Sequence, residues 1–238
     1  MASGSGGFDL TDPFDCHAYL VESGGEGVLV DAGIGAAVDD LLQNLEAAGV
    51  APGGVRLLLL THAHPDHAGA AAALRERLPS VEVAASPEVA RWVASADEEA
   101  ISVASGKLAG FYPEGFGFEP CPVERELAHG DVVRFGDLAF EAIATPGHSA
   151  GHLSYRLETE TGSALFCGDL LFWGGRISLV SNWDCSLDAY VKSLERLRGA
   201  EVDSLLPGHH SISVARGQRH IDAALRLTDR GFVPPSVV

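Results

Sequence analysis

The sequence predicts an α/β chain in which two β-sheets pack face to face and helices cover their outer sides. Apolar segments of strand length alternate with segments that repeat apolar residues at helical spacing, and this succession occurs twice along the chain. The chain has 238 residues, of which 46% are hydrophobic, and this is enough for a substantial core. Because no linker separates the two halves, we predict a single domain over residues 1–238.

The first half contains four predicted strands and three predicted helices. A turn at Gly24 and Gly25 joins the first two strands, and Gly49 is expected to end the first helix. Ser86 is expected to cap the third helix, with Pro87 in its first turn. The strands are expected at 18–22, 27–31, 55–60 and 81–84, and the helices at 36–48, 68–78 and from 87 onward.

The second half repeats this style after an interruption at residues 97–124. The interruption carries Phe111, Tyr112 and Phe116 among glycines and prolines, and two interpretations stay open. It is either an irregular surface segment that packs its own aromatic rings, or a lid or pocket wall next to a substrate. The later strands are expected at 132–135, 138–143, 153–157, 164–167 and 204–206, and the later helices at 187–198 and 214–230.

Charge and composition narrow the class of partner. The net charge of -17 argues against a nucleic-acid backbone as partner. No apolar run approaches the ~20 residues that span a bilayer, and no signal peptide is recognised; residues 1–9 are expected to be a flexible tail. The four cysteines form no C-x-x-C pair, so we expect a reduced, cytoplasmic protein. The expected partner is a small molecule, without nucleic acid or membrane, and a homodimer stays open.

The stretch from Thr61 to His67 carries the strongest chemical signal. It reads Thr-His-Ala-His-Pro-Asp-His and follows an apolar strand, so three histidines and one aspartate lie on a tight loop. Since side chains alternate along an extended loop, His62 and His64 can point the same way. Asp66 and His67 follow at once and can reach a second point. Four residues of metal-ligand type within six positions predict a metal site rather than a cluster of surface histidines.

Three more residues of ligand type follow later strands, each beside a glycine that lets the backbone bend. They are His148 in Pro-Gly-His, Asp169 in Gly-Asp and His209 in Pro-Gly-His. Gathered at one edge of the sheets, the full set would hold two transition metals with one shared carboxylate, and imidazole with carboxylate suits zinc or iron. The set comprises His62, His64, Asp66, His67, His148, Asp169 and His209.

This pattern closely resembles that of the metallo-β-lactamase superfamily, over roughly residues 14–210. The resemblance implies an αββα four-layer sandwich with two mixed sheets and the metals at one edge. It implies His62, His64 and His148 on the first metal, with Asp66, His67 and His209 on the second and Asp169 between them. Asp31, in Asp-Ala-Gly, would lie behind the ligands and orient the histidine loop. The expected cofactor is two divalent metal ions, zinc first, with iron or manganese as alternatives.

The chemistry expected of such a pair is hydrolysis. A water between two cations ~3.5–4 Å apart has its pKa lowered to about 7, so hydroxide is present at neutral pH. That hydroxide would attack the carbonyl carbon of a thioester, ester or lactone, with Asp66 orienting it or carrying a proton. The segment Pro-Gly-His-Ser-Ala-Gly-His resembles glyoxalase II-like hydrolases and favours thioesters. The alternative is an iron oxidoreductase of the persulfide dioxygenase type; a β-lactamase or a ribonuclease is disfavoured.

The sequence also contains histidines and aromatic residues outside the predicted ligand set. His152 is expected to be buried and hydrogen-bonded rather than a ligand, and His220 is expected to be solvated. Phe111, Tyr112 and Phe116, together with Trp173 and Trp183, are candidates for the substrate pocket. The sequence assigns no role to Cys185, His17 or His210.

Overall fold

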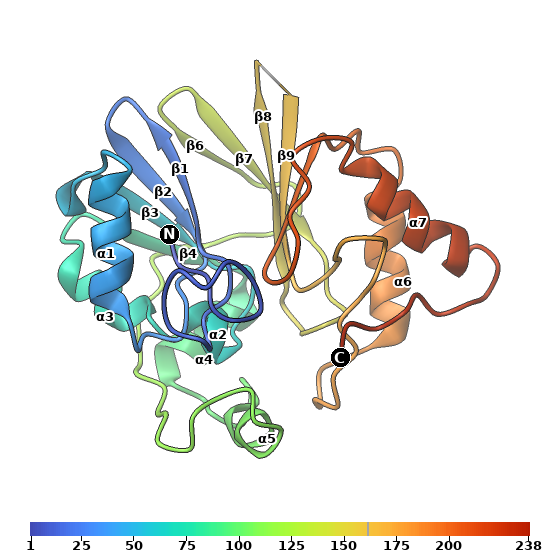
Figure 1. Cartoon of the computed structure of the whole chain (residues 1–238), viewed down its shortest axis with the longest axis horizontal. Helices are drawn as coiled ribbons and strands as arrows, with labels where there is room; N and C mark the ends of the chain where they lie inside the picture. The colour runs from blue at the N-terminus through green and yellow to red at the C-terminus, as the bar shows by residue number, and fades with distance from the viewer. Residues whose placement is uncertain (161) are drawn as a thin grey trace. The chain divides into compact units, whose positions relative to one another are not determined.

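The computed structural model describes residues 1–160 and 162–238, which form two compact units, Met1–Leu127 and Ala128–Val238. Each unit contains a five-stranded mixed sheet and its own helices (Figure 1). The prediction of an α/β chain with two mixed sheets is therefore confirmed, while the single domain over 1–238 stays a prediction. Among the described residues, none of the helices combines the length and apolar content that crossing a bilayer requires.

The sheet of the first unit has the strand order β1-β2-β3-β4-β5. β1 and β2 pair antiparallel, and the other neighbours pair parallel. The central strand β3 is buried along almost its whole length, which explains its run of leucines. The strands are β1 (Tyr19–Ser23), β2 (Glu26–Val30), β3 (Val55–Leu59), β4 (Glu82–Ala85) and β5 (Arg125–Glu126).

The helices of the first unit bury one face each. In α1, Leu41, Leu42 and Leu45 are buried, and Figure 1 shows α1 and α3 on the same face of the sheet. Ser86 caps α4 by accepting a hydrogen bond from the backbone N–H of Val89, as predicted. The helices are α1 (Val38–Ala47), η1 (Pro52–Gly54), α2 (Pro65–Ala68), α3 (Ala71–Arg77), α4 (Pro87–Ser95) and α5 (Val103–Leu108).

Two expectations for the first unit need correction. The helix expected at 68–78 is divided: α2 ends at Ala68, and α3 begins at Ala71. Residues 1–9 do not lack contacts, because Ala2 pairs with Ala18 and Ser3 is buried. Residues 1–9 were predicted to be a tail because they are small and lack an apolar pattern. Their small size is also what lets this part of the backbone pack closely against the rest of the unit.

The interrupted segment 97–124 contains the short helix α5 and otherwise no regular element. Its aromatic rings contact one another: the ring centroids of Tyr112 and Phe116 are 6.2 Å apart, and those of Phe116 and Phe118 are 6.4 Å apart. The segment therefore packs its own aromatics, and its role as a lid or pocket wall stays a prediction.

The sheet of the second unit has the order β10-β9-β8-β7-β6, with β9 and β10 parallel and the other pairs antiparallel. Helices α6 and α7 lie beside β9 and β10, and together they enclose a core that includes Leu165, Tyr190 and Ile221 (Figure 1). The elements are β6 (Val132–Phe135), β7 (Leu138–Ala144), β8 (Leu153–Thr159), β9 (Gly162–Gly168), α6 (Leu187–Arg196), β10 (Ser204–Pro207) and α7 (Gln218–Thr228).

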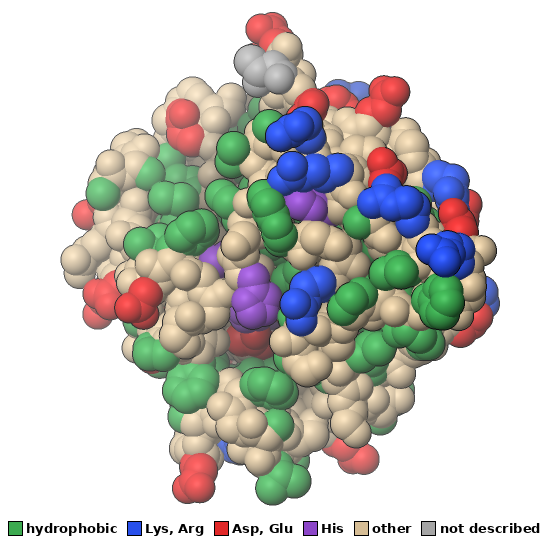
Figure 2. Space-filling model, turned by 45° about the vertical axis from the view of Figure 1, so that its right-hand side comes forward, with side chains coloured by type: hydrophobic (Ala, Val, Ile, Leu, Met, Phe, Trp, Pro, Cys, Tyr) green, Lys and Arg blue, Asp and Glu red, His purple; other side chains and the backbone are tan. Residues whose placement is uncertain are grey.

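The surface around α6 and α7 carries mixed charge. Figure 2 shows basic side chains on the side of the molecule that bears these helices, with acidic side chains among them. On α6, Lys192 pairs with Asp188, and beyond this helix Arg198 pairs with Glu195 and Asp229. Exposed pairs of this kind contribute little stability. The exclusion of a nucleic-acid partner stays a prediction.

Candidate metal centre

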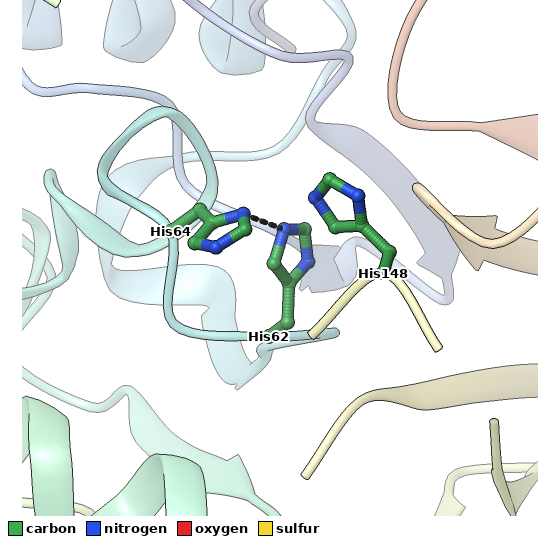
Figure 3. A group of neighbouring side chains, drawn as sticks. All are labelled: His62, His64 and His148. Atoms are coloured by element: carbon green, nitrogen blue, oxygen red, sulfur yellow. Dashed lines mark hydrogen bonds between the residues drawn. The ribbon is translucent and has the colours of Figure 1, made fainter. Parts of the chain in front are cut away.

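The histidine loop follows β3 and leads into α2. His62 and His64 lie on the extended part, and their rings approach each other with His62 Nε2 3.1 Å from His64 Nδ1 (Figure 3). The turn of α2 then places Asp66 Oδ2 3.7 Å from His67 Nε2. A tetrahedral zinc ion with Zn–N bonds of about 2.0–2.1 Å separates two ligand nitrogens by roughly 3.3 Å. The spacing of the His62 and His64 nitrogens therefore suits two ligands of one ion.

Asp31 organises this loop from behind. Its Oδ1 accepts a hydrogen bond from the backbone N–H of Thr61 at 2.7 Å, and its Oδ2 accepts one from the Thr61 hydroxyl at 2.9 Å. Asp31 Oδ2 also lies 2.8 Å from His67 Nδ1. A buried carboxylate only accepts, so His67 carries its proton on Nδ1 and presents the Nε2 lone pair.

The same carboxylate fixes the tautomer of His62 through Thr61. Because the Thr61 hydroxyl donates to Asp31, its oxygen is left to accept from His62 Nδ1, which lies 3.0 Å away. His62 therefore also presents Nε2. All three residues are buried, so the arrangement is shielded from competing water.

Cys16 is a neighbour of Asp31 that sequence reasoning did not single out. One ligand-type atom from each of Cys16, Asp31 and His67 lies within 4.8 Å of the other two. Burial raises the pKa of the Cys16 thiol to about 12, so it stays a neutral thiol at physiological pH. Its position on a segment without regular structure offers no sequence signal for this proximity.

The second unit places its three predicted ligands together. His148 follows β7, Asp169 follows β9 and His209 follows β10. Asp169 Oδ2 lies 3.6 Å from His148 Nε2 and 3.7 Å from His209 Nε2. One carboxylate oxygen thus faces two imidazoles, which suits an acid shared between two ions. His148, also labelled in Figure 3, has its Nδ1 3.1 Å from the carbonyl oxygen of Ser178 and so presents Nε2.

Tyr190 on α6 supports these ligands without touching their side chains. Its hydroxyl oxygen lies 2.7 Å from the carbonyl oxygen of Ser178 and 3.1 Å from that of Asp169. Its ring also lies against Gly147, where a Cβ atom would come within 2.6 Å of the ring, and φ at Gly147 is 156°. Only glycine leaves room for the ring beside His148. No local pattern in the sequence marks Tyr190 for this role.

Asp184 stabilises the loop that carries His148 through the residues that follow this histidine. Its Oδ2 accepts hydrogen bonds from the Ser149 hydroxyl at 2.8 Å and from the backbone N–H of Ala150 at 2.9 Å. Next along the chain, the N–H of Ser186 donates to the carbonyl of Gly147. The backbone on both sides of His148 is thus fixed to the segment that precedes α6.

The other predicted site residues occupy varied environments. His152 is fully buried, with Nδ1 2.9 Å from the Thr145 hydroxyl oxygen, which is the buried position that the sequence favours. Among the pocket candidates, Tyr112 is buried and Phe116 is half-buried. The remaining three are exposed: Phe111, Trp173 and Trp183. Their role as a substrate pocket stays a prediction.

The prediction of a solvated His220 is wrong. The side chain is buried, its Nδ1 accepts a hydrogen bond from the backbone N–H of Gly174, and its ring centroid is 4.6 Å from that of Trp173. Trp173 also carries Arg219 over its ring. His220 lies on the buried face of α7 together with Ile221, Ala224 and Leu225, and its burial follows from that position.

Among residues without an assigned role, His17 is buried beside Ser3, whereas His210 is exposed with its ring near Phe172. Burial of part of its ring lowers the pKa of His210. Cys185 is half-buried.

The donor set of each unit fits divalent transition metals. Imidazole nitrogen and carboxylate oxygen are ligands that zinc and iron accept, and the described ligand rings His62, His67 and His148 each have Nδ1 held by an acceptor of the chain. A histidine held in this way presents Nε2 in its metal-binding form. The residues present therefore fit the metal ions that the sequence predicts, while the identity of the metal stays open.

Comparison with known proteins identifies the family. The chain belongs to the metallo-beta-lactamase superfamily, whose model matches residues 11–209. It is 30% identical to a hydroxyacylglutathione hydrolase of Acidiphilium cryptum, over 93% of this chain and 77% of the relative. It is 32% identical to an acyl-coenzyme A thioesterase of Gallus gallus, over 88% of this chain and 79% of the relative. The predicted family and the predicted class, a hydrolase, are confirmed.

Other matches cover different shares of the molecule. A hydroxyacylglutathione hydrolase of Thermosynechococcus vestitus is 38% identical over 51% of this chain, which spans only 36% of that relative. A metallo-beta-lactamase family protein of Thermus thermophilus has a TM-score of 0.68 at 26% identity, over 90% of this chain and 75% of that structure. The metallo-beta-lactamase BJP-1 of Bradyrhizobium japonicum has a TM-score of 0.69 at 20% identity, over 94% and 91%, and shows the fold alone.

Proposed function

We propose that this protein is a metal-dependent hydrolase of thioesters and that the donors of both units serve the same two divalent metal ions, with zinc as the expected metal. The observation that carries the proposal is the fixed tautomer of the histidines: Asp31 and the Ser178 carbonyl hold Nδ1 of His67 and His148 and leave Nε2 to bind. The relatives named as a hydroxyacylglutathione hydrolase and an acyl-coenzyme A thioesterase support the substrate class.

The reaction consumes one water per thioester. Two bound divalent cations would supply a nucleophile from water at neutral pH and stabilise the charge that develops on the carbonyl oxygen. The new C–O bond forms as the C–S bond breaks, which yields a carboxylic acid and a thiol. Asp66 receives the proton that the attacking water loses and returns it to the departing sulfur. Its carboxylate is suited to this because its side chain is only partly buried, 3.7 Å from His67.

The decisive experiment joins metal analysis to a substrate panel. Protein purified without added metal is analysed for zinc, iron and manganese, and is then assayed with acyl-coenzyme A, acylglutathione, an oxygen ester, a lactone and a glutathione persulfide. We expect two divalent ions per chain and release of free thiol from the thioesters. Oxygen consumption with the persulfide by an iron-loaded chain would replace the proposal with a sulfur oxidoreductase.

A substitution tests the role of Asp66 directly. Asp66→Asn should lower turnover of a thioester by about 100-fold or more, the scale of a positioned acid–base group, while circular dichroism stays unchanged. Asp39→Asn is the control, because Asp39 is an exposed acid of the same unit whose ion pair with Arg77 lies on the surface. Full activity of Asp66→Asn would refute the role.

A further inference from the structure

The two carboxylate oxygens of Asp66 have different neighbours. Oδ1 accepts a hydrogen bond from the hydroxyl of Tyr112, which lies 3.2 Å away. Oδ2 lies 3.7 Å from Nε2 of His67. A carboxylate is a symmetrical ligand, and a single bond from its Cβ lets it rotate, so a donor on one oxygen decides which oxygen faces the neighbouring imidazole. The Tyr112 hydroxyl is such a donor.

The ring of Tyr112 is held in place by its own segment. It is 8% exposed and lies against Gly106 in α5, where a Cβ atom would come within 2.0 Å of the ring. The backbone N–H of Phe111 donates to the carbonyl of Gly106 at 2.9 Å and closes the turn between them. Gly106 weakens a helix interior, and its small size is what the ring requires. Gly106, Tyr112 and Asp66 therefore form a chain of direct contacts.

We propose that Tyr112 is a positioning residue for Asp66 and that segment 97–124 thereby sets the affinity of the second metal ion. This inference rests on the proposed function, because it takes Asp66 as a ligand of that ion. With the hydroxyl on Oδ1, Oδ2 is the oxygen turned toward His67 and available for the ion. Without the hydroxyl, the carboxylate loses this restraint on its rotation and must be ordered when the ion binds.

The contribution is of the kind made by groups that orient metal ligands. Removing such a partner lowers metal affinity by about 10–100-fold. The effect should fall on one of two ions, because the donors of the other include His62, whose ring is held through Nδ1 by Thr61 and not by Tyr112. A role of Tyr112 as a pocket wall predicts something else: the ring, and not the hydroxyl, would matter, and the change would appear in KM for the substrate.

The test is a metal titration of the full chain from which metal has first been removed. Binding is monitored by absorption when the metal is cobalt and by calorimetry when it is zinc. Tyr112→Phe keeps the ring and removes the hydroxyl, and should weaken the second binding event by about 10–100-fold while the first is unchanged. Thioester turnover should fall at limiting metal and recover with excess metal, at unchanged KM. Tyr19→Phe is the control, because it removes a phenolic hydroxyl from β1 of the same unit.

A second variant tests the contact chain independently. Gly106→Ala displaces the ring of Tyr112 and should weaken the same binding event, and the double variant should be no worse than Tyr112→Phe alone. Unchanged binding of both ions by Tyr112→Phe would overturn the inference and leave the proposed function standing. Fewer than two ions on the unsubstituted chain would overturn both. The titration contains no substrate, so these failures are distinguishable.

Discussion

The two units orient their ligand histidines with different kinds of group. In the first unit the acceptor is a buried carboxylate, Asp31, which touches His67 directly and reaches His62 through Thr61. In the second unit the acceptor is a backbone carbonyl, that of Ser178, beside which lies the Tyr190 hydroxyl. A buried carboxylate forms the stronger hydrogen bond with a histidine ring, but the orientation of the ring then depends on one side chain. A backbone carbonyl forms a weaker hydrogen bond, but the packing of a whole loop holds it in place.

Among the substitutions that compare the two units, Asp31→Asn should have the largest effect. Asparagine tolerates the left-handed backbone, with φ of 62°, but places an N–H₂ or a weaker acceptor against His67 Nδ1. Where the N–H₂ faces the ring, the proton of His67 must move to Nε2, which then cannot bind metal. Metal affinity should fall by about 10–100-fold in a zinc titration.

Asp15→Asn is the matched control for this change. Asp15 is a buried acid of the same unit that accepts from the backbone N–H of Ile34 and from Thr11. Since it contacts no predicted ligand, its substitution should affect stability and leave metal affinity unchanged. Equal losses of metal in both variants would mean that any buried carboxylate change disturbs the loop, and the comparison of the units would fail.

A smaller effect is expected from Tyr190→Phe. The ring keeps its place against Gly147, while the Ser178 carbonyl loses its donor and the Ser178 N–H loses its acceptor, so the free energy of unfolding should fall by about 1–3 kcal/mol. Because the hydroxyl bonds only backbone groups, metal affinity should fall by less than about tenfold. Urea unfolding and a zinc titration measure the two quantities, with Tyr155→Phe on β8 as control. A loss as large as that of Asp31→Asn would show that the two units depend equally on a single side chain.

The smallest effect concerns pH and His220 in the second unit. Burial lowers the pKa of His220 from its usual 6.5, and Nδ1 accepts the Gly174 N–H, so the folded chain prefers the neutral ring. As pH falls below 6.5 the unfolded chain binds a proton first, and the free energy of unfolding decreases until the lowered folded pKa is passed. Above 6.5 both states are neutral and the effect disappears. His220→Asn places its Oδ1 where Nδ1 lies and can accept the same N–H without titrating, so its unfolding free energy should vary less between pH 7 and 5; an unchanged slope would contradict this.

Much of the fold and the site could be predicted because the signals are local. Leucines on β3, the Ser86 cap and the residues that follow strand ends each lie within a few positions of the element they define. His148, Asp169 and His209 were recognisable because each stands beside a glycine at the end of a strand. The family pattern then supplied the expectation for Asp31, which the hydrogen bonds to Thr61 and His67 explain.

What could not be predicted depends on contacts between distant residues. Tyr112 meets Asp66 from 46 positions away, and Tyr190 meets the Asp169 carbonyl from 21 positions away. Periodicity does not reveal such contacts, since neither tyrosine differs locally from an ordinary aromatic residue. The packing of residues 1–9 was missed for the same reason, whereas the burial of His220 follows the helical spacing that it shares with Ala224.

The left-handed backbone at Asp31 also restricts what a library of random codons could place there. Glycine and asparagine suit the dihedral angle but lack the charge, and glutamate keeps the charge at the cost of strain and of a longer reach. The backbone conformation and the need for a charged acceptor therefore both restrict the residue at position 31. A growth selection that requires the enzyme should return aspartate alone at position 31, and this makes the position a sensitive internal standard for such a screen.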